Sequence, residues 1–348
     1  MGLFCFRARS SACGDQGSQS TGLSACWRRY GLDSLASAFD MFVHSDLFPC
    51  DNNTLIRHTH EFESDISAMI AFPSIDPVAI SLGPAKVHWY GLMYLLAFAS
   101  AWWLGKYRAR QDQSLVRPEQ IDDLIFYGAL GAVLGGRIGS VIFYNFDSFL
   151  QNPLYLFKIW EGGMSFHGGF LGVLVAMEIY RRKLGCRFWE LTDFIAPLVP
   201  LGLAAGRFGN FINAELWGAP GNVPWAMKLS CEQFPPDRYI DFAGPLCFSA
   251  RHPTQLYEML LEGILLFAAL WFISSKPRPV MTISGYFLML YGLARTSVEF
   301  IRLPDAHIGY LFNTEWLTRG IVLSIPMIIV GLILLTLAKR ESNNAAIS

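Results

Sequence analysis

Seven apolar segments between residues 88 and 338 constrain the fold of this chain more than any other feature. They lie at about residues 88–105, 121–143, 166–180, 191–211, 255–273, 281–300 and 320–338. A helix needs about 20 apolar residues to cross the hydrocarbon core of a bilayer, where the backbone must satisfy its own hydrogen bonds. Only 16% of the residues are charged, whereas soluble domains carry about 25%. The sequence therefore predicts an all-α polytopic membrane protein with seven transmembrane helices.

Basic residues gather in alternate loops between the apolar segments, and this pattern predicts an orientation. They are Lys106, Arg108, Arg110, Arg117, Arg181, Arg182, Lys183, Arg187, Lys276, Arg278, Lys339 and Arg340. Loops rich in lysine and arginine stay in the cytoplasm. The other connections, 145–165, 212–254 and 301–319, hold fewer basic residues for their length. We expect these connections outside, residues 212–254 as a small head between spans four and five, and the C-terminus inside.

Residues 1–68 differ in composition from the rest of the chain. They are rich in serine, aspartate and arginine and contain no apolar run long enough for a signal peptide or a span. We expect a poorly ordered extension there. The stretch from Met69, MIAFPSIDPVAISLGPAKVHWYGL, has the character of a natural start. Our hypothesis is that translation begins near Met69, so that residues 69–348 form the seven-span membrane domain and 1–68 is a start-site artefact.

Composition also excludes several classes of function. The formal net charge of −1 gives no overall field that would attract nucleic acid. No cysteine and histidine cluster has metal-ligand spacing, and no glycine-rich phosphate loop lies between a strand and a helix. We therefore expect chemistry without a cofactor or a metal. Cys231 and Cys247 share the expected outer loop, where either a disulfide or two free buried thiols is possible.

The string GRFGNFINAELWG, residues 206–218, ends the fourth apolar segment with unusual polarity. Arg207 and Asn210 share one face if the helix continues. A guanidinium group offers a planar fork of donors that suits phosphate, and asparagine adds an amide donor. The alternative is an ordinary helix end with an arginine that extends to the interface. An arginine at the edge of a span indicates an anionic ligand, since a charge there is costly when unpaired.

The sixth apolar segment carries one polar stripe. Tyr291, Arg295, Glu299 and Arg302 follow at intervals of four, four and three residues, which places them within about 80° of arc on a helix. Arg295 and Glu299 can form a purely structural ion pair. The additional arginine indicates that an anion is also bound.

Two further spans contain ionisable residues that need partners in a bilayer. In RHPTQLYEMLLE, Glu258 and Glu262 line one face of span five, and we expect Glu258 to pair with an arginine of span two, four or six. Arg137 of span two either pairs with an acid such as Asp193 or Glu258 or binds substrate. It lies within a stripe of small residues that predicts close packing against another helix. The stripe consists of Gly128, Gly131, Gly135 and Gly139.

Two aromatic motifs complete the candidate site. In EGGMSFHGG, glycines on both sides leave the ring of His167 accessible, and its ordinary pKa of about 6.5 suits a proton acceptor. His167 is otherwise a helix cap or a hydrogen-bonding core residue. In HWYG, Tyr90 either turns inward or belongs to an interfacial aromatic belt. Because spans one, three, four and six each bring a polar group to the outer leaflet, a phosphate-bearing lipid is the expected ligand.

These motifs together resemble those of the prolipoprotein diacylglyceryl transferase family. The signature-like GRFGNFINAELWG and the segments HWYGLMYL, EGGMSFHGG, RHPTQLYE and YGLARTSVEFIRLPD occur in the family's order, between about Phe72 and Arg340. The resemblance implies a bacterial inner-membrane enzyme of seven spans with residues 212–254 as a small periplasmic head. It implies transfer of the diacylglyceryl group of phosphatidylglycerol to the lipobox cysteine of prolipoprotein signal peptides. A thioether and glycerol 1-phosphate would form.

The resemblance also implies roles for individual residues. It makes Arg207 the essential arginine, Arg295 the second phosphate-binding arginine, and His167 the histidine of the HGG motif. The family's other functional positions fall on Tyr90, Asn210, Glu215, Gly218, Glu258, Tyr291 and Glu299. We expect His167, Arg207, Arg295 and Tyr291 to be catalytic, with His167 as the base or Tyr291 sharing that task. The remaining positions, together with both arginines, are expected to bind substrate.

Two other classes of function remain open at this stage. A transporter or flippase for an anionic lipid also places polar residues within its spans, but it would leave the lipid chemically unchanged. A scaffold would bind phosphatidylglycerol without any reaction. In each case we expect a monomer in contact with membrane lipids and no nucleic acid.

Overall fold

The computed structural model describes residues 70–73, 75–83, 85–111, 114–158, 162–237, 239–241, 243–304 and 309–347. The expected extension at residues 1–68 lies outside the described residues. The rest, from Met69 onward, forms one compact unit. The description below concerns that unit alone.

Helices dominate the described part of the chain, as the apolar segments predict. Single helices are α5 (Trp89–Ala109), α6 (Gln120–Tyr144), α8 (Phe166–Leu184), α13 (Thr282–Glu299) and α14 (Arg319–Ile347). Two more helical paths are composite: α9 (Phe188–Ile195), η3 (Ala196–Leu198) and α10 (Val199–Ile212), then α11 (Thr254–Glu258), the π-helical η5 (Met259–Leu265) and α12 (Leu266–Ile273). By length and composition, four segments of the described chain are able to cross a membrane: Gln120–Tyr144, Phe188–Ile212, Thr254–Ile273 and Arg319–Asn344. The chain is therefore a mostly helical integral membrane protein.

The glycine stripe of α6 packs directly on α8. A Cβ atom added to Gly139 would lie 2.7 Å from the Cα of Gly168, and one added to Gly131 would lie 2.9 Å from the Cβ of Ala176. Real Cβ atoms do not approach so closely, so only glycine permits this contact between the two helices. The predicted close packing is confirmed for Gly131, Gly135 and Gly139, which face α8, whereas a Cβ added to Gly128 would meet nothing within 4 Å.

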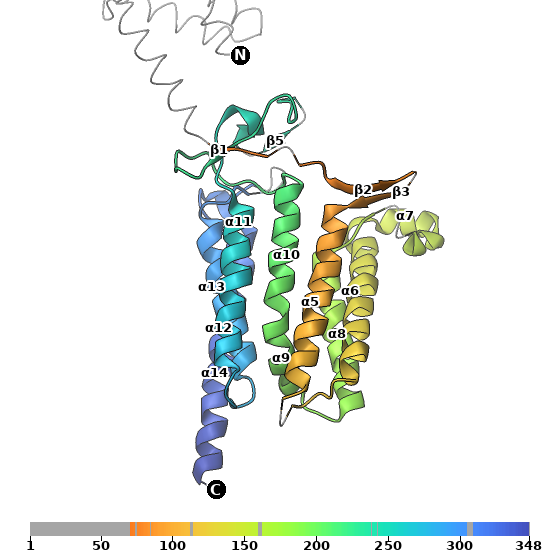
Figure 1. Cartoon of the computed structure of the whole chain (residues 1–348), viewed down its shortest axis with the longest axis vertical. Helices are drawn as coiled ribbons and strands as arrows, with labels where there is room; N and C mark the ends of the chain where they lie inside the picture. The colour runs from red at the N-terminus through yellow and green to blue at the C-terminus, as the bar shows by residue number, and fades with distance from the viewer. Residues whose placement is uncertain are drawn as a thin grey trace, which may run out of the picture. The chain divides into compact units, whose positions relative to one another are not determined.

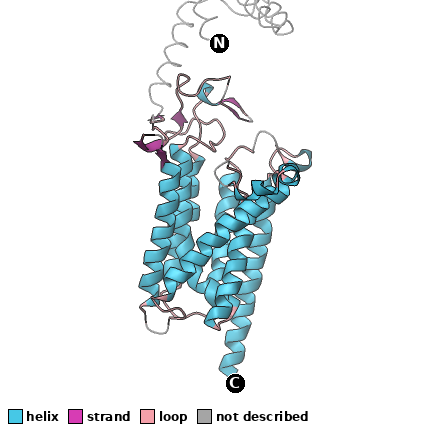
Figure 2. Ribbon diagram, turned by 90° about the vertical axis from the view of Figure 1, so that its right-hand side faces the viewer, coloured by secondary structure: helices cyan, strands magenta, loops and turns pink. Residues whose placement is uncertain are grey.

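Small sheets and loops cover one end of the helices (Figures 1 and 2). They contain β1 (Ile70–Ala71) with β4 (Met227–Lys228), β2 (Val78–Leu82) with β3 (Ala85–His88), and β5 (Ile240–Asp241) with β6 (Gly244–Pro245). The helical turns α7 (Phe146–Gln151), η1 (Pro153–Phe157) and η4 (Leu246–Phe248) lie among the same loops. The C-terminal end of α14 lies at the opposite end (Figure 1). The connections α5–α6, α8–α9 and α12–α13 lie there too (Figure 1), so the basic loops share one end of the bundle.

The segment between α10 and α11 folds into a small head with its own core. Phe72, Phe211 and Trp217 form edge-to-face and tilted ring pairs there, with Leu229 and Leu246 buried beside them. Cys231 and Cys247 are joined by a disulfide. Of the two states that the sequence left open for these cysteines, the bridged one is found.

Candidate functional site

Three arginines and three glutamates meet where the helices reach the head. They are Arg207 of α10, Glu258 of α11, Glu262 of η5, Arg295 and Glu299 of α13, and Arg302 just after α13. We call this group the arginine–glutamate cluster. Glu258 and Glu262 are 0% exposed, whereas the side chains of Arg207, Arg295 and Arg302 keep 19%, 14% and 12% of their surface accessible. The carboxylates are thus buried behind arginines that still face solvent or ligand.

Glu258 is the centre of the cluster. Its Oε2 atom lies 3.1 Å from Nη1 of Arg207. Its Oε1 atom accepts hydrogen bonds from Nη1 of Arg295 and, at 3.2 Å, from Nη1 of Arg302. A partner for Glu258 in span two, four or six was predicted, and the structure provides arginines from spans four and six. Removing one member of such a buried ion pair leaves its partners as unpaired buried charges. This lowers the free energy of unfolding by about 3–5 kcal/mol.

Glu262 and Glu299 hold the two main arginines from their other sides. Nη2 of Arg207 donates to Oε2 of Glu262 at 3.2 Å. Nη2 of Arg295 lies 2.7 Å from Oε2 of Glu299, the predicted i, i+4 pair within α13. Arg207 is therefore oriented by two carboxylates and Arg295 by three, because Nη1 of Arg295 also lies 3.8 Å from Oε1 of Glu262. Arg207 and Arg295, from separate helices, converge on one small region as expected.

The π-helical turn η5 places Glu262 in this cluster. Glu262 and Glu258 face the same arginines from successive turns, although the backbone widens between them. Within the turn, Gly263 packs on Ala204 of α10, where an added Cβ would lie 2.9 Å from the Cα of Ala204. π-turns occur often at functional sites. The sequence pattern placed Glu262 on the correct face but gave it no role in the site.

Asn210, Glu215 and Gly218 shape the chain that leaves α10. Nδ2 of Asn210 donates to Oε2 of Glu215 at 3.3 Å, and the N–H of Glu215 donates to the carbonyl of Asn210 at 3.0 Å. Gly218 pairs through its backbone with Arg302 and His252. A side chain at Gly218 would place its Cβ 2.6 Å from the methyl group of Thr254, so glycine is required here. These residues form the turn that follows α10, and their expected contact with substrate stays a prediction.

The two tyrosines lie on helices that border the cluster. Tyr90 is half-buried on α5, and its ring lies against Gly209 of α10. It also contacts the ring of Tyr94, with centroids 5.2 Å apart. Tyr291 precedes Arg295 by one helical turn and stacks on Phe287. Both tyrosines are therefore placed close to the arginines in the helical framework.

His167 lies on α8, which supplies no residue of the arginine–glutamate cluster. It is exposed in the first turn of α8 and contacts the ring of Phe166, with centroids 5.7 Å apart. Ser165 caps this helix by accepting a hydrogen bond from the N–H of Gly168 at 3.3 Å. Among the described residues, no hydrogen bond or ion pair links His167 to Arg207 or Arg295. The expected convergence of the two guanidinium groups is thus found, and the approach of the His167 imidazole to them stays a prediction.

Arg137 fulfils neither of the two roles considered for it. Its guanidinium donates to backbone carbonyls at 3.0 Å (Leu156), 2.5 Å (Tyr155) and 2.5 Å (Gly162), and it also lies 4.6 Å from the centroid of the Tyr155 ring. A fourth carbonyl, of Gly163, accepts at 3.4 Å. Asp193 instead accepts hydrogen bonds from the N–H and hydroxyl of Ser284. Arg137 therefore holds the loop that leads to α8.

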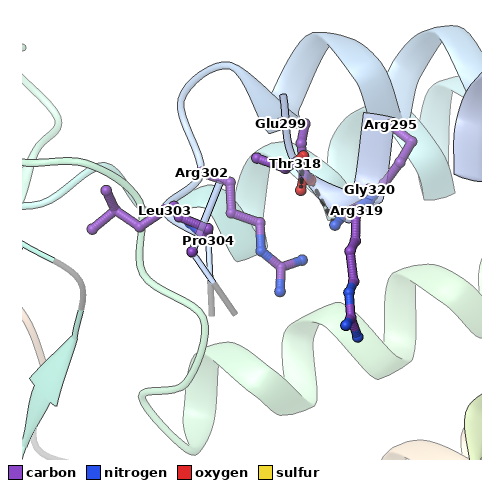
Figure 3. A pocket seen from close by; sticks show the side chains of 9 residues that line it. Arg295, Glu299, Arg302, Leu303, Pro304, Thr318, Arg319 and Gly320 are labelled. Atoms are coloured by element: carbon purple, nitrogen blue, oxygen red, sulfur yellow. Dashed lines mark hydrogen bonds and ion pairs between the residues drawn. The ribbon is translucent and has the colours of Figure 1, made fainter. Parts of the chain in front are cut away.

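A cavity of about 80 Å³ adjoins the cluster between the end of α13 and the start of α14 (Figure 3). Its lining consists of Arg295, Glu299, Arg302, Leu303, Pro304, Gly309, Thr318, Arg319 and Gly320. Sequence reasoning did not assign Thr318, Arg319 or Gly320 to the site. The available signal was an arginine at the start of an apolar segment, which is also common at membrane interfaces. In the described part of the chain, no group of three or more His, Cys, Asp and Glu side chains is arranged to hold a metal ion.

Comparison with known proteins gives consistent matches over most of the chain. The family model described as prolipoprotein diacylglyceryl transferase matches residues 77–337. A protein of Marinomonas sp. (strain MWYL1) is 53% identical over 76% of this chain and 93% of its own length. One of Coxiella burnetii (strain RSA 331 / Henzerling II) is 55% identical over 76% and 95%. One of Pseudomonas syringae pv. syringae (strain B728a) is 49% identical over 80% and 98%. Each of the three is named phosphatidylglycerol–prolipoprotein diacylglyceryl transferase.

Proposed function

The chain belongs to the prolipoprotein diacylglyceryl transferase family, and we propose that it transfers the diacylglyceryl group of phosphatidylglycerol to the cysteine thiol of prolipoproteins at the arginine–glutamate cluster. The single observation that carries the assignment to this place is the convergence of Arg207 and Arg295 on Glu258 and Glu262. Two guanidinium groups from separate helices form an oriented pair of phosphate ligands.

The membrane topology follows from the same framework. The four apolar segments, together with α5, α8 and α13, form seven spans in the bacterial inner membrane. The basic loops face the cytoplasm and the head at residues 212–254 faces the periplasm. The membrane domain therefore begins on the periplasmic side, and the C-terminus of α14 lies in the cytoplasm. The enzyme acts as a monomer, since one chain supplies all six residues of the arginine–glutamate cluster.

The reaction is a displacement at the C3 carbon of the diacylglyceryl group. The cysteine thiol of the lipobox loses its proton, its sulfur forms a bond with C3, and the bond between C3 and the phosphate oxygen breaks. The electron pair of that bond goes to the phosphate oxygen, so negative charge grows on the departing glycerol 1-phosphate. Arg207 and Arg295 stabilise this charge because their carboxylate partners orient them before the reaction begins.

Donor and acceptor bind to different parts of the site. The arginines of the cluster hold the phosphate, and the turn formed by Asn210, Glu215 and Gly218 contacts the backbone of Arg302 through Gly218. A free thiol has a pKa of about 8.5 and is only partly ionised at pH 7. His167, exposed at the start of α8, accepts the thiol proton. Tyr291, one turn from Arg295, borders the phosphate.

The test uses the purified full chain, phosphatidylglycerol vesicles and a peptide with a lipobox cysteine. Glycerol phosphate should be released with the cysteine peptide and not with a serine peptide. The variants Arg207→Ala and His167→Ala should lose turnover while still folded, and Arg182→Ala, an exposed arginine paired with Glu178, is the matched control. Lipid translocation without glycerol phosphate would identify a flippase instead, and full activity of Arg207→Ala would remove the cluster from the mechanism.

A further inference from the structure

The cavity beside the cluster has a polar lining dominated by arginine. Arg295 and Arg302 reach it from the end of α13, and Arg319 reaches it from the first turn of α14. The side chains of Arg302 and Arg319 both extend toward the open space (Figure 3). Glu299 contributes a carboxylate to the same lining. At about 80 Å³ the cavity is comparable in size to a phosphate group.

The charges around this cavity are not fully paired. Arg207, Arg295 and Arg302 are matched by Glu258, Glu262 and Glu299 within the cluster. Arg319 is exposed, and no carboxylate of the described residues lies within ion-pair distance of it. Arg319 is therefore an additional positive charge at the cavity that the cluster itself does not neutralise.

Negative charge grows on the phosphate during the reaction, and an additional positive charge stabilises it. The phosphodiester of phosphatidylglycerol carries one negative charge, whereas a phosphate monoester carries about −1.5 to −2 at pH 7. Breaking the bond between C3 and oxygen thus adds negative charge to a group that the neutral cluster already holds. A cation next to the leaving oxygen lowers the free energy of that state more than it stabilises intact lipid.

The first turn of α14 is fixed in place at this cavity. The hydroxyl of Thr318 donates to Oε1 of Glu299 at 2.8 Å and accepts from the N–H of Ile321 at 3.3 Å. A Cβ on Gly320 would lie 2.7 Å from Oε2 of Glu299, so the helix start contacts the cluster directly. Arg319, between these two residues, is consequently held at the cavity. The N-terminal end of this long helix adds a partial positive charge.

We propose that this cavity is the binding subsite of the departing glycerol phosphate, with Arg302 and Arg319 as its phosphate ligands. Glu299 faces the same space and is placed to accept a hydrogen bond from a glycerol hydroxyl. The inference rests on the proposed function, because that reaction supplies the ligand. No further reactant is needed: the electron pair of the broken bond stays with the phosphate oxygen, and the thiol proton goes to the base.

Direct binding tests this subsite without any transfer reaction. Isothermal titration calorimetry of the purified full chain in detergent would use sn-glycerol 1-phosphate, with inorganic phosphate and glycerol as probes of each half of the ligand. Arg319→Met should weaken glycerol phosphate binding about tenfold or more, as expected for the loss of a hydrogen bond to a charged group. Arg319→Lys should retain most of the affinity, and Arg182→Ala should not change it. Equal affinity of wild type and Arg319→Met would overturn the proposal.

A kinetic measurement decides whether Arg319 binds free glycerol phosphate or the head group of the intact lipid. In the transferase assay, the inhibition constant of added glycerol phosphate should rise about tenfold in Arg319→Met, and the KM for phosphatidylglycerol should rise much less. A rise in KM with an unchanged inhibition constant would place Arg319 in the lipid site and refute the product subsite. A wild-type chain that binds glycerol phosphate through Arg319 but transfers nothing would refute the proposed function and leave the anion site standing.

Discussion

Replacing Arg137 should loosen the loop before α8 and not the arginine–glutamate cluster. Arg137 is 2% exposed, and its guanidinium binds two stretches of backbone through the carbonyls of Tyr155 and Leu156 and of Gly162 and Gly163. The arginine thus joins two separate parts of the loop before α8. Arg137→Leu keeps the apolar stem and removes every one of these donors.

The loss of stability in Arg137→Leu depends on how exposed the carbonyl acceptors of Arg137 are. Gly162 and Gly163 are exposed, so water replaces Arg137 at their carbonyls at little cost. Tyr155 and Leu156 are half-buried, and the carbonyl of Tyr155 keeps the N–H of Lys158 as a donor at 3.2 Å. The carbonyl of Leu156 loses its Arg137 donor, so Arg137→Leu should lower the free energy of unfolding by about 1–3 kcal/mol. Arg137→Lys retains the charge and some of the hydrogen bonds, so its loss should be about half as large.

Hydrogen–deuterium exchange of the purified variants in detergent is the direct assay. Exchange should rise in residues 155–169, which include the start of α8 and His167, and should remain unchanged in α13. Transfer activity should fall in the same order, with Lys closer to wild type than Leu. An Arg137→Leu variant with wild-type thermal stability and unchanged exchange of this loop would refute the reasoning.

Three other changes test separate parts of the structure. Glu258→Gln removes the negative charge that Arg207, Arg295 and Arg302 share. It should lower the free energy of unfolding by about 3–5 kcal/mol and abolish transfer. A variant with the melting temperature of the wild type would contradict the role of Glu258 as the centre of the cluster. Gly139→Ala should separate α6 from α8 and lower the melting temperature by several degrees, whereas the same substitution at the unconfined Gly128 should not. Burial lowers the pKa of His252, so in the folded protein its ring stays neutral at pH values below about 6.5, where a free histidine takes up a proton. Stability should therefore fall as pH drops from about 7 to 5, and His252→Gln should flatten that profile in thermal unfolding scans.

The helices were predictable because each depends on a local property of the sequence. Apolar length determines where α5, α6 and α14 run, and the i, i+4 spacing of Arg295 and Glu299 determines their ion pair. The wide turn η5 was not predictable, since nothing in MLLEGIL distinguishes a π-turn from an α-helix. It depends on the contact of its glycine with α10.

The sequence predicted which residues belong to the candidate site better than it predicted how they are arranged. Acids and arginines in apolar spans must find partners, and this reasoning led to Glu258 and its arginines. It failed for Arg137, because backbone carbonyls carry no signature in the sequence and a buried cation was expected to find an acid. Arg319 was missed because its role depends on a cavity formed by the start of another helix. The partners of such residues are set by long-range packing.

The antiparallel contact between Gly218 and Arg302 links the head to the cluster through main chain alone. The N–H of Ala219 donates to the carbonyl of Ile301 at 2.8 Å, so the first residues of the head are hydrogen-bonded to the chain that leaves α13. A displacement of the head at this point therefore also moves the backbone of Arg302, whose guanidinium contacts Glu258. A displacement of Arg302 in turn shifts the first residues of the head.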